Sequence, residues 1–194
     1  KIINNLLWNL ELEEVPMDND IARVLYSKAD IKEACERLGK QLTKDYAGKR
    51  PLILSVLTGA MFFTTDVVRE FDVYSEIDFI DVSSYKGGME STGTVDLVSD
   101  LSEDISGRDV LIIEDIVDTG RTLSYIVDLL YSRNAKSVKI CTFLDKPAGR
   151  VVEAKADYVG FTVPKEFVVG YGLDYQGYYR NLPYVGVLKP EVYE

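Results

Sequence analysis

The sequence predicts an α/β domain with a mostly parallel central sheet and helices on both faces. Short apolar runs, among them residues 52–57 and 110–113, alternate along the chain with segments whose apolar residues recur at helical spacing. Uninterrupted apolar runs are typical of strands buried on both faces, and strands that alternate with helices form parallel sheets. The 194 residues are enough for one well-buried domain of this class and short for two.

Composition argues against several classes of function. The formal net charge of -10 disfavours a nucleic-acid or anionic-membrane surface, which would need a basic patch. The sequence has no histidine, and Cys35 and Cys141 are far apart, so a zinc site, a Cys–His nucleophile and a Ser–His–Asp triad are excluded or nearly so. Two scattered cysteines are typical of a reducing cytoplasm, and no apolar run approaches the roughly 18 residues of a membrane span. We therefore expect a cytoplasmic protein with no nucleic-acid and no membrane partner.

Residues 1–16 are interpreted as an N-terminal extension that precedes the main domain, residues 17–194. Apolar residues between Ile3 and Leu10 recur at helical spacing and are followed by an acidic stretch before Pro16. This pattern predicts a short amphipathic helix that docks on the body of the protein or on a neighbouring subunit. It is not typical of a signal peptide, because asparagines interrupt the apolar part and no small-residue cleavage site follows.

The next segment, residues 29–46, carries apolar side chains at the helical period and predicts a surface helix. Asp30 is placed as its N-terminal cap, and Gly48 follows just past its end. Residues 52–57 then predict a buried strand, which is followed by a turn and by a second helix through Phe71.

Two connections could lie against a ligand. Thr58 and Gly59 form the turn after the strand, where Gly59 either permits a close backbone approach to a ligand or only serves the turn itself. Residues 83–93 have no period and lie between a strand at 76–82 and a returning arm at 94–98. Long loops of this kind are either lids or plain solvated connections.

The segment from Val110 to Leu123 combines a strand, an acidic cluster, a turn and a helix start. Glu114 and Asp115 stand at the end of the apolar run, at the sheet edge where open α/β folds place their ligands. The helix begins near residues 119–122, and the free N–H groups at its start form a site for anions. The segment therefore predicts a ligand site.

Each polar residue of this segment also has an ordinary structural explanation. Glu114 and Asp115 could flank a strand, and Asp118 or Thr119 could cap the helix. Together, however, three carboxylates around one phosphate-sized site would repel a phosphate unless a hard divalent cation intervened. The combination predicts a polyphosphorylated substrate bound with magnesium. Neither a GxxxxGK[ST] loop nor a GxGxxG motif occurs in the chain.

Further strands are predicted at residues 137–144 and 157–163. Lys146, just after the first of them, is either a solvated charge or a donor to a carbonyl oxygen of a ligand. The last part of the chain is dense in aromatic residues and glycines, as in residues 167–175. Strands and aromatic packing explain such a run, but an aromatic followed by an acid and an arginine could also stack a flat base, bind a metal and hold a phosphate.

Several of these motifs resemble one family. The acidic pair after the apolar run, two more apolar residues and the sequence DTGRT resemble the phosphoribosyl-pyrophosphate (PRPP) motif of the type I phosphoribosyltransferases. The DKP segment at Asp145, the FVVGYGLDY run and the SSY loop resemble the purine branch, the bacterial-type hypoxanthine-guanine phosphoribosyltransferases. The resemblance covers nearly everything after about Asp20 and implies the type I phosphoribosyltransferase fold, with a small hood made of terminal segments.

The resemblance implies phosphoribosyl transfer from PRPP to a 6-oxopurine base, hypoxanthine and also guanine, with Mg²⁺ as cofactor. It assigns Asp118 as general acid/base and assigns PRPP or phosphate binding to Glu114, Asp115, Asp118, Thr119, Gly120, Arg121, Thr122, Thr58, Gly59 and Arg180. It assigns purine binding to Lys146, Phe167 and Val168, and metal binding to Asp174, Glu114 and Asp115. It assigns the lid to Ser84 and Tyr85. Some members carry lysine in place of Thr58, so a side-chain charge contact at that position is not implied.

Two other functions are kept as alternatives. An enzyme of the same branch could prefer xanthine, because discrimination depends on carbonyl placement near Val168 and Asp174 and on waters. A non-catalytic PRPP-sensing regulator on the same fold would need a basic nucleic-acid surface or an added DNA-binding domain, and this acidic chain shows neither. The resemblance further implies a homodimer or homotetramer, with PRPP and a 6-oxopurine base as small-molecule partners.

Overall fold

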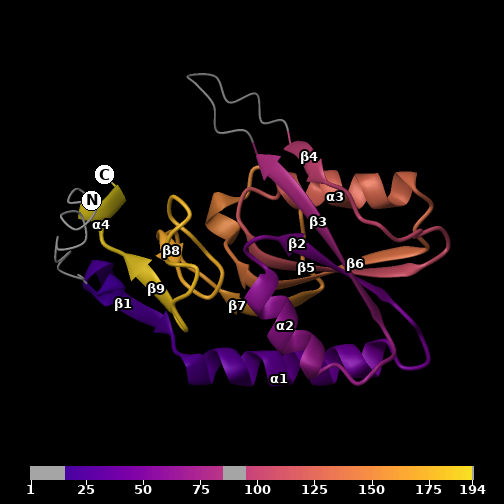
Figure 1. Ribbon diagram of the computed structural model, residues 1–194, viewed down its shortest axis with the longest axis horizontal. Helices are drawn as coiled ribbons and strands as arrows, with labels where there is room; N and C mark the ends of the chain where they lie inside the picture. Colours follow the sequence, from indigo (N-terminus) through magenta and orange to yellow (C-terminus); the bar gives the residue numbers. More distant parts are fainter. Residues whose placement is uncertain (1–15, 85–94, 194) are drawn as a thin grey trace, which may run out of the picture.

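The structure, a computed structural model, describes residues 16–84 and 95–193 and contains two sheets (Figure 1). The larger sheet has the strand order β4-β3-β2-β5-β6-β7. Its strands are β2 (Leu52–Leu57), β3 (Glu76–Ser84), β4 (Val95–Ser99), β5 (Asp109–Val117), β6 (Ser137–Asp145) and β7 (Tyr158–Thr162). The smaller, which we call the hood sheet, has the order β1 (Ile21–Tyr26), β9 (Val185–Leu188) and β8 (Val168–Val169). The helices are α1 (Lys28–Asp45), α2 (Met61–Arg69), α3 (Arg121–Ser132) and α4 (Pro190–Tyr193), with 3-10 turns η1 (Met17–Asp20) and η2 (Pro147–Gly149).

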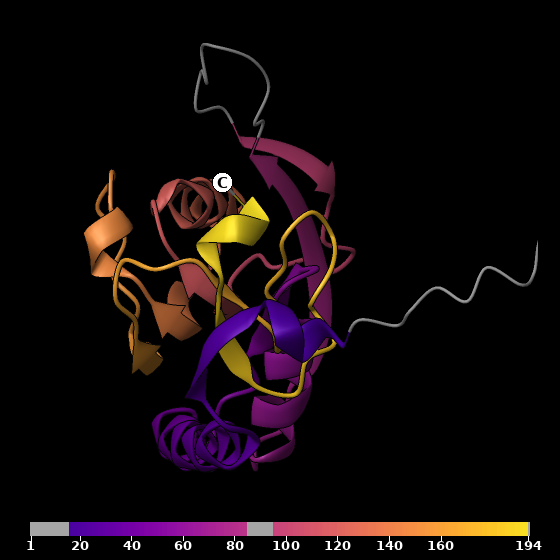
Figure 2. The same cartoon turned by 90° about the vertical axis from the view of Figure 1, so that its left-hand side faces the viewer.

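The larger sheet is parallel except at one edge. β2 pairs in parallel with β3 and β5, and β6 pairs in parallel with β5 and β7, whereas β4 runs antiparallel to β3. Helices α1 and α2 cover one face and α3 covers the other (Figure 1, Figure 2). The predicted α/β fold with helices on both faces is confirmed.

Strand β5 lies in the middle of the larger sheet, and its sequence explains this position. Residues 110–113 are fully buried, because the odd-numbered side chains pack with α1 and α2 and the even-numbered ones pack with α3. The sequence pattern predicts the end of this strand before Glu114, which is wrong. The strand continues to Val117, because β6 supplies partners: Glu114 pairs with Thr142 and Val117 with Asp145.

The hood sheet joins segments from the two ends of the described chain. β1 pairs with β9 and β9 pairs with β8, both antiparallel. Lys146, directly after β6, lines a pocket together with Phe167 and Leu188 of the hood region, so the hood sheet lies over the C-terminal ends of the parallel strands. The sequence reasoning did not predict β1, because its exposed middle residues show no alternating apolar pattern.

The start of α1 corrects one expectation from the sequence. Ser27, and not Asp30, is the N-cap residue: its hydroxyl accepts a hydrogen bond from the N–H of Asp30, whose carboxylate accepts one from the N–H of Ser27. This reciprocal pair is a capping box. Gly48 follows the helix with φ 75°, a conformation that favours glycine, so the end of the helix lies where it is predicted.

Two expectations fall on parts of the chain outside the described residues. The helix predicted within residues 1–16 concerns residues 1–15, and Tyr85 of the predicted lid follows Ser84, the last residue of β3. Both stay predictions. Within residues 16–84 and 95–193, none of the helices has the length and apolar character that crossing a membrane needs.

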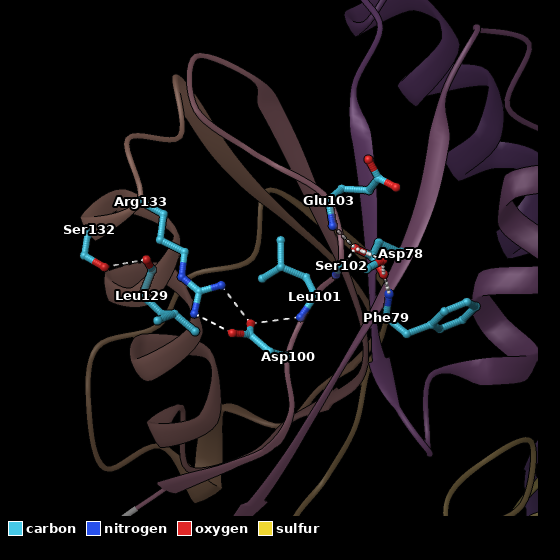
Figure 3. A network of polar contacts seen from close by, with 9 residues as sticks. All are labelled: Asp78, Phe79, Asp100, Leu101, Ser102, Glu103, Leu129, Ser132 and Arg133. Carbon is cyan, nitrogen blue, oxygen red and sulfur yellow. Dashed lines mark hydrogen bonds and ion pairs between the residues drawn. The ribbon is translucent and has the colours of Figure 1, made fainter.

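A buried carboxylate on β3 anchors the connection between β4 and β5 (Figure 3). Asp78 is 8% exposed and accepts hydrogen bonds from the N–H groups of Ser102, at 2.7 Å, and Glu103, at 2.9 Å. Burial opposes its ionisation, but these and other backbone N–H groups more than offset burial and lower the pKa of Asp78. Nearby, Asp100 pairs with both terminal nitrogens of Arg133 at the end of α3. The two carboxylates hold this polar connection against β3 and α3.

We expect Asp78→Asn to lower the free energy of unfolding by about 1 to 3 kcal/mol near neutral pH, because the amide accepts fewer of these hydrogen bonds. Since the folded-state pKa is lowered, the wild-type advantage is complete above the ordinary aspartate pKa of about 3.9 and is lost as the pH falls through the folded-state value. Urea unfolding at a series of pH values measures both effects. Asp128→Asn, at an exposed position on α3, is the control, and equal small effects of the two variants would contradict the anchor role.

Candidate active site

A cavity of about 450 Å³ lies at the C-terminal ends of β2 and β5, beside the start of α3. We call it the acidic cavity. Its lining includes Thr58, Gly59, Glu114, Asp115, Asp118, Thr119, Gly120, Thr122, Asp174 and Arg180. These residues come from the turn after β2, from β5 and the turn that follows it, from the start of α3, and from the segment between β8 and β9. The fold therefore brings together most of the residues that the resemblance assigns to PRPP and metal.

The start of α3 opens into the acidic cavity without a side-chain cap. Gly120 is the N-cap residue, with φ 84°, and the Thr119 hydroxyl accepts only a long hydrogen bond, 3.4 Å, from the N–H of Arg121. The capping role considered for Asp118 or Thr119 is therefore wrong. A Cβ on Gly120 would lie 2.7 Å from the carbonyl oxygen of Val152, so backbone conformation and space both require glycine. The first N–H groups of the helix are available to an anion such as a phosphate.

Glu114 and Asp115 place negative charge at the buried end of β5. Glu114 is 6% exposed, and its Oε2 atom has no hydrogen-bond partner among the described residues. Burial raises the pKa of Glu114 well above its ordinary value, and the charge of Asp115 raises it further. Burial also raises the pKa of Asp115. A cation would relieve these effects, so the pair fits a divalent metal ion.

Asp174, the third carboxylate assigned to a metal, lines the same cavity and is paired within the protein. Its carboxylate contacts the Arg180 guanidinium at 2.8 Å and accepts a hydrogen bond from the N–H of Gly177 at 2.7 Å. In the described part of the chain, no three His, Cys, Asp or Glu side chains converge in a preformed metal cage. Magnesium is typically held by one or two carboxylates and by substrate phosphates, so the arrangement is compatible with this ion.

Close contacts between backbone segments shape the acidic cavity. A Cβ on Gly59 would lie 1.6 Å from a carboxylate oxygen of Asp115, and a Cβ on Gly172 would lie 2.0 Å from the carbonyl oxygen of Gly59. Contacts within the protein therefore require both glycines. The turn after β2 is held between Asp115 and Gly172, and the exposed Thr58 lines the cavity beside it.

A second pocket, of about 400 Å³, lies between the hood sheet and the end of β6. We call it the hood pocket, and its lining includes Lys146 and Phe167, which the resemblance assigns to the purine. The ring of Phe167 stacks on Tyr193 of α4, with centroids 4.9 Å apart. Val168 is buried in β8. Its side chain packs in the hydrophobic core that contains residues of α1 and α2, and it does not line the hood pocket. The pocket thus offers an aromatic face and an ammonium group.

Asp118 connects the two pockets. It lines the acidic cavity, and its Oδ2 atom lies 3.4 Å from Nζ of Lys146, which lines the hood pocket. The side chain of Asp118 is 43% exposed, so a ligand can reach it. A Cβ on Gly149 would lie 1.6 Å from its other oxygen, which shows how closely the η2 backbone approaches it. A carboxylate and an ammonium group thus lie side by side where the pockets meet.

One residue that the resemblance assigns to the site lies outside both pockets, and two unassigned residues lie near them. Arg121 begins α3 but lines neither the acidic cavity nor the hood pocket. Two residues that were not assigned from the sequence make contacts near the site: Tyr193 stacks on Phe167, and Arg150 donates a hydrogen bond to Val117 at the end of β5. No sequence signal pointed to Tyr193, and Arg150 was visible only as the end of the polar segment after β6.

We expect Glu114→Gln to raise the free energy of unfolding of the ligand-free protein by about 1 to 3 kcal/mol near neutral pH, because it removes a buried carboxyl group whose ionisation is opposed by burial and by Asp115. The folded-state pKa of Glu114 is raised, so the wild-type protein loses stability as the pH rises from the ordinary glutamate value of about 4.3 toward the folded-state value. Below that window the two proteins should be equally stable. Thermal unfolding against pH measures the difference, with the exposed Glu33→Gln as control. A less stable Glu114→Gln protein near neutral pH would contradict this account.

Known proteins resemble the chain in sequence and in fold. Residues 24–176 match the model of the phosphoribosyl transferase domain family. A hypoxanthine-guanine phosphoribosyltransferase of Streptococcus pneumoniae is 55% identical over 91% of this chain and 98% of its own length. The crystal structure of a hypoxanthine phosphoribosyltransferase from Staphylococcus aureus matches with a TM-score of 0.88 and 53% identity, over 92% of this chain and 97% of that chain.

A longer relative matches through only one of its parts. The bifunctional protein TilS/HprT of Listeria monocytogenes is 59% identical over 91% of this chain, which spans 27% of that protein. The part that the family model matches includes Glu114, Asp115 and Asp118 of the acidic cavity and Lys146 and Phe167 of the hood pocket. The chain therefore belongs to the phosphoribosyl transferase domain family and, within it, to the hypoxanthine-guanine phosphoribosyltransferases.

Proposed function

We propose that the chain transfers the 5-phosphoribosyl group of PRPP to a 6-oxopurine base, hypoxanthine and also guanine, in purine salvage. The products are IMP or GMP and pyrophosphate. The meeting of the two pockets at Asp118, 3.4 Å from Lys146, supports this most strongly. One pocket has the helix start and carboxylates that a sugar polyphosphate needs, and the other has an aromatic ring and an ammonium group that suit an oxopurine.

The acidic cavity would hold the sugar and its 5-phosphate. The phosphate accepts hydrogen bonds from the N–H and hydroxyl groups of residues 119–122, because the start of α3 has no side-chain cap. Glu114 and Asp115 bind the ribose hydroxyls, directly or through the metal. Their negative charge also stabilises the positive charge that builds on the ribose as its bond to pyrophosphate breaks.

The pyrophosphate group would lie between the turn after β2 and Arg180. The backbone at Gly59 and the Arg180 guanidinium both border the acidic cavity. Magnesium, when bound, neutralises the leaving group, and Glu114, Asp115 and Asp174 are the carboxylates that would hold it. Arg180 pairs with Asp174 at 2.8 Å, which supports a shared role of this arginine and this carboxylate at the diphosphate.

The purine base would lie in the hood pocket against Phe167. Lys146 donates a hydrogen bond to the oxygen on the ring, and the backbone at Val168 reads the ring edge. Asp118 acts as general acid/base: its carboxylate accepts the proton that the purine ring loses as the ring nitrogen bonds to the anomeric carbon and pyrophosphate leaves. The position of Asp118 between the pockets suits this role, because the new bond forms where base and sugar meet.

Three further features complete the proposal. Ser84 and Tyr85 would belong to a lid, which would exclude water that could otherwise hydrolyse PRPP. The enzyme acts in the cytoplasm, in keeping with its two free and buried thiols, Cys35 and Cys141. By resemblance to its family, its assembly is a homodimer or homotetramer.

With Mg²⁺ and PRPP, purified protein should convert hypoxanthine and guanine to nucleoside monophosphates and should convert xanthine more slowly. Chromatography of the products at matched base concentrations measures the three rates. Faster turnover of xanthine than of the other two bases would favour a xanthine-preferring enzyme. No turnover with any of the three bases would refute the proposed function.

The role of Asp118 is tested with Asp118→Asn, which keeps the size of the side chain and removes its proton-transfer group. It should lower kcat by about 10²- to 10⁴-fold, as is typical of general acid–base residues. PRPP affinity should change little, because the helix start and the other carboxylates stay in place. A wild-type rate in Asp118→Asn would remove Asp118 from the proposed chemistry.

A further inference from the structure

Arg150 lines neither the acidic cavity nor the hood pocket, but it contacts the segments that form both. Its guanidinium donates hydrogen bonds to the carbonyl oxygen of Val117, at 3.2 Å, and to that of Ala154, and it pairs with the carboxylate of Asp145. The side chain of Arg150 is 19% exposed, so these contacts are largely shielded from water. One side chain thus joins the last residue of β5 to the last residue of β6.

These contacts lie next to the residues where the two pockets meet. Val117 directly precedes Asp118, and Asp145 directly precedes Lys146. Arg150 therefore contacts the residue that precedes each member of this pair, through the backbone at Val117 and through the carboxylate at Asp145. Its position, rather than any contact with a ligand, is what connects it to the site.

Backbone hydrogen bonds join the same two segments. The N–H of Lys146 donates to the carbonyl oxygen of Val117 at 3.0 Å, and the N–H groups of Val151 and Val152 donate to the carbonyl oxygen of Thr119 at 3.0 and 3.1 Å. These bonds need a fixed spacing between the turn before α3 and the segment after β6. Arg150 spans the same gap with a planar group that donates in several directions, which a lysine could not do.

We propose that Arg150 is a positioning residue that couples the phosphate-binding turn, residues 118–122, to the base-binding segment, residues 145–149. That these two segments bind the phosphate and the base of one ligand rests on the proposed function. A nucleotide fills both pockets at once and binds well only if their spacing is correct, whereas a free base or a free sugar phosphate can bind at either spacing. The loss of Arg150 should therefore weaken nucleotide binding more than the binding of either fragment.

The test measures dissociation constants of IMP, hypoxanthine and ribose 5-phosphate for wild-type protein, Arg150→Met and Arg150→Lys. Arg150→Met should weaken IMP binding about tenfold more than it weakens the binding of either fragment, an effect typical of coupled contacts. Arg150→Lys keeps the charge that pairs with Asp145 but not the planar group, so it should fall between the other two proteins. Equal weakening of all three ligands would indicate a general structural role and would overturn the coupling.

Arg133→Met is the matched control. Arg133 also pairs with an aspartate, in its case through both terminal nitrogens, but its partner Asp100 lies in the connection between β4 and β5 and lines neither pocket. This variant should leave the ratio of IMP affinity to fragment affinity unchanged. A change as large as that of Arg150→Met would show that the ratio responds to any lost ion pair, and the coupling would then be rejected.

Hydrogen exchange tests the same coupling without any ligand. Arg150→Met should speed exchange of the N–H groups of Lys146, Val151 and Val152 together by about tenfold, since these groups bridge the two segments. Arg133→Met should not. If wild-type protein bound no IMP while this exchange effect was present, the proposed function would fail and the coupling of the two segments would stand. Unchanged exchange in Arg150→Met would overturn the coupling whatever the ligands do.

Discussion

Negative charge at the buried end of β5 is the constraint on which the rest of the site depends. A buried carboxylate without a partner is unfavourable, and Glu114 has an oxygen in that condition beside Asp115. The strand cannot shift to expose it, because residues 110–113 pack against helices on both faces of the sheet. The fold therefore keeps two carboxyl groups, whose ionisation burial opposes, at the place where a metal-bound polyphosphate would favour their ionised form. Stability of the empty protein and affinity for such a ligand oppose each other at this strand.

Around this charge, the site is built from backbone segments that approach one another very closely. Gly59, Gly120, Gly149 and Gly172 each lie where a Cβ would collide with a neighbouring segment. Because no side chains intervene, the turn after β2, the turn before α3 and the segment after β6 form a compact unit around the acidic cavity. Such packing holds donors and charges in place before a ligand arrives, which is how preorganised electrostatic sites gain their strength.

Local patterns in the sequence predicted the sheet, its helices and the acidic motif, but not the features that depend on distant partners. The apolar run of β5 was visible, whereas its extension to Val117 depends on pairing with β6. Strand β1 was missed because it pairs with β9, at the other end of the chain. In the site, the resemblance supplied residues from several separate segments, but not the contacts between them. The pairing of Asp174 with Arg180, the stacking of Tyr193 on Phe167 and the contacts of Arg150 arise only from the folded arrangement.

Anomalous scattering from Mn²⁺ in crystals of the protein with PRPP would locate the metal and the phosphates directly. Manganese can replace magnesium because both ions prefer oxygen ligands. If the carboxylates at the end of β5 determine where the substrate binds, the ion should lie about 2.2 Å from a carboxylate oxygen of Glu114, Asp115 or Asp174, or should contact one of them through a single water. The 5-phosphate should then lie at the uncapped start of α3. A metal and a phosphate bound away from β5 and α3 would contradict this account of the site.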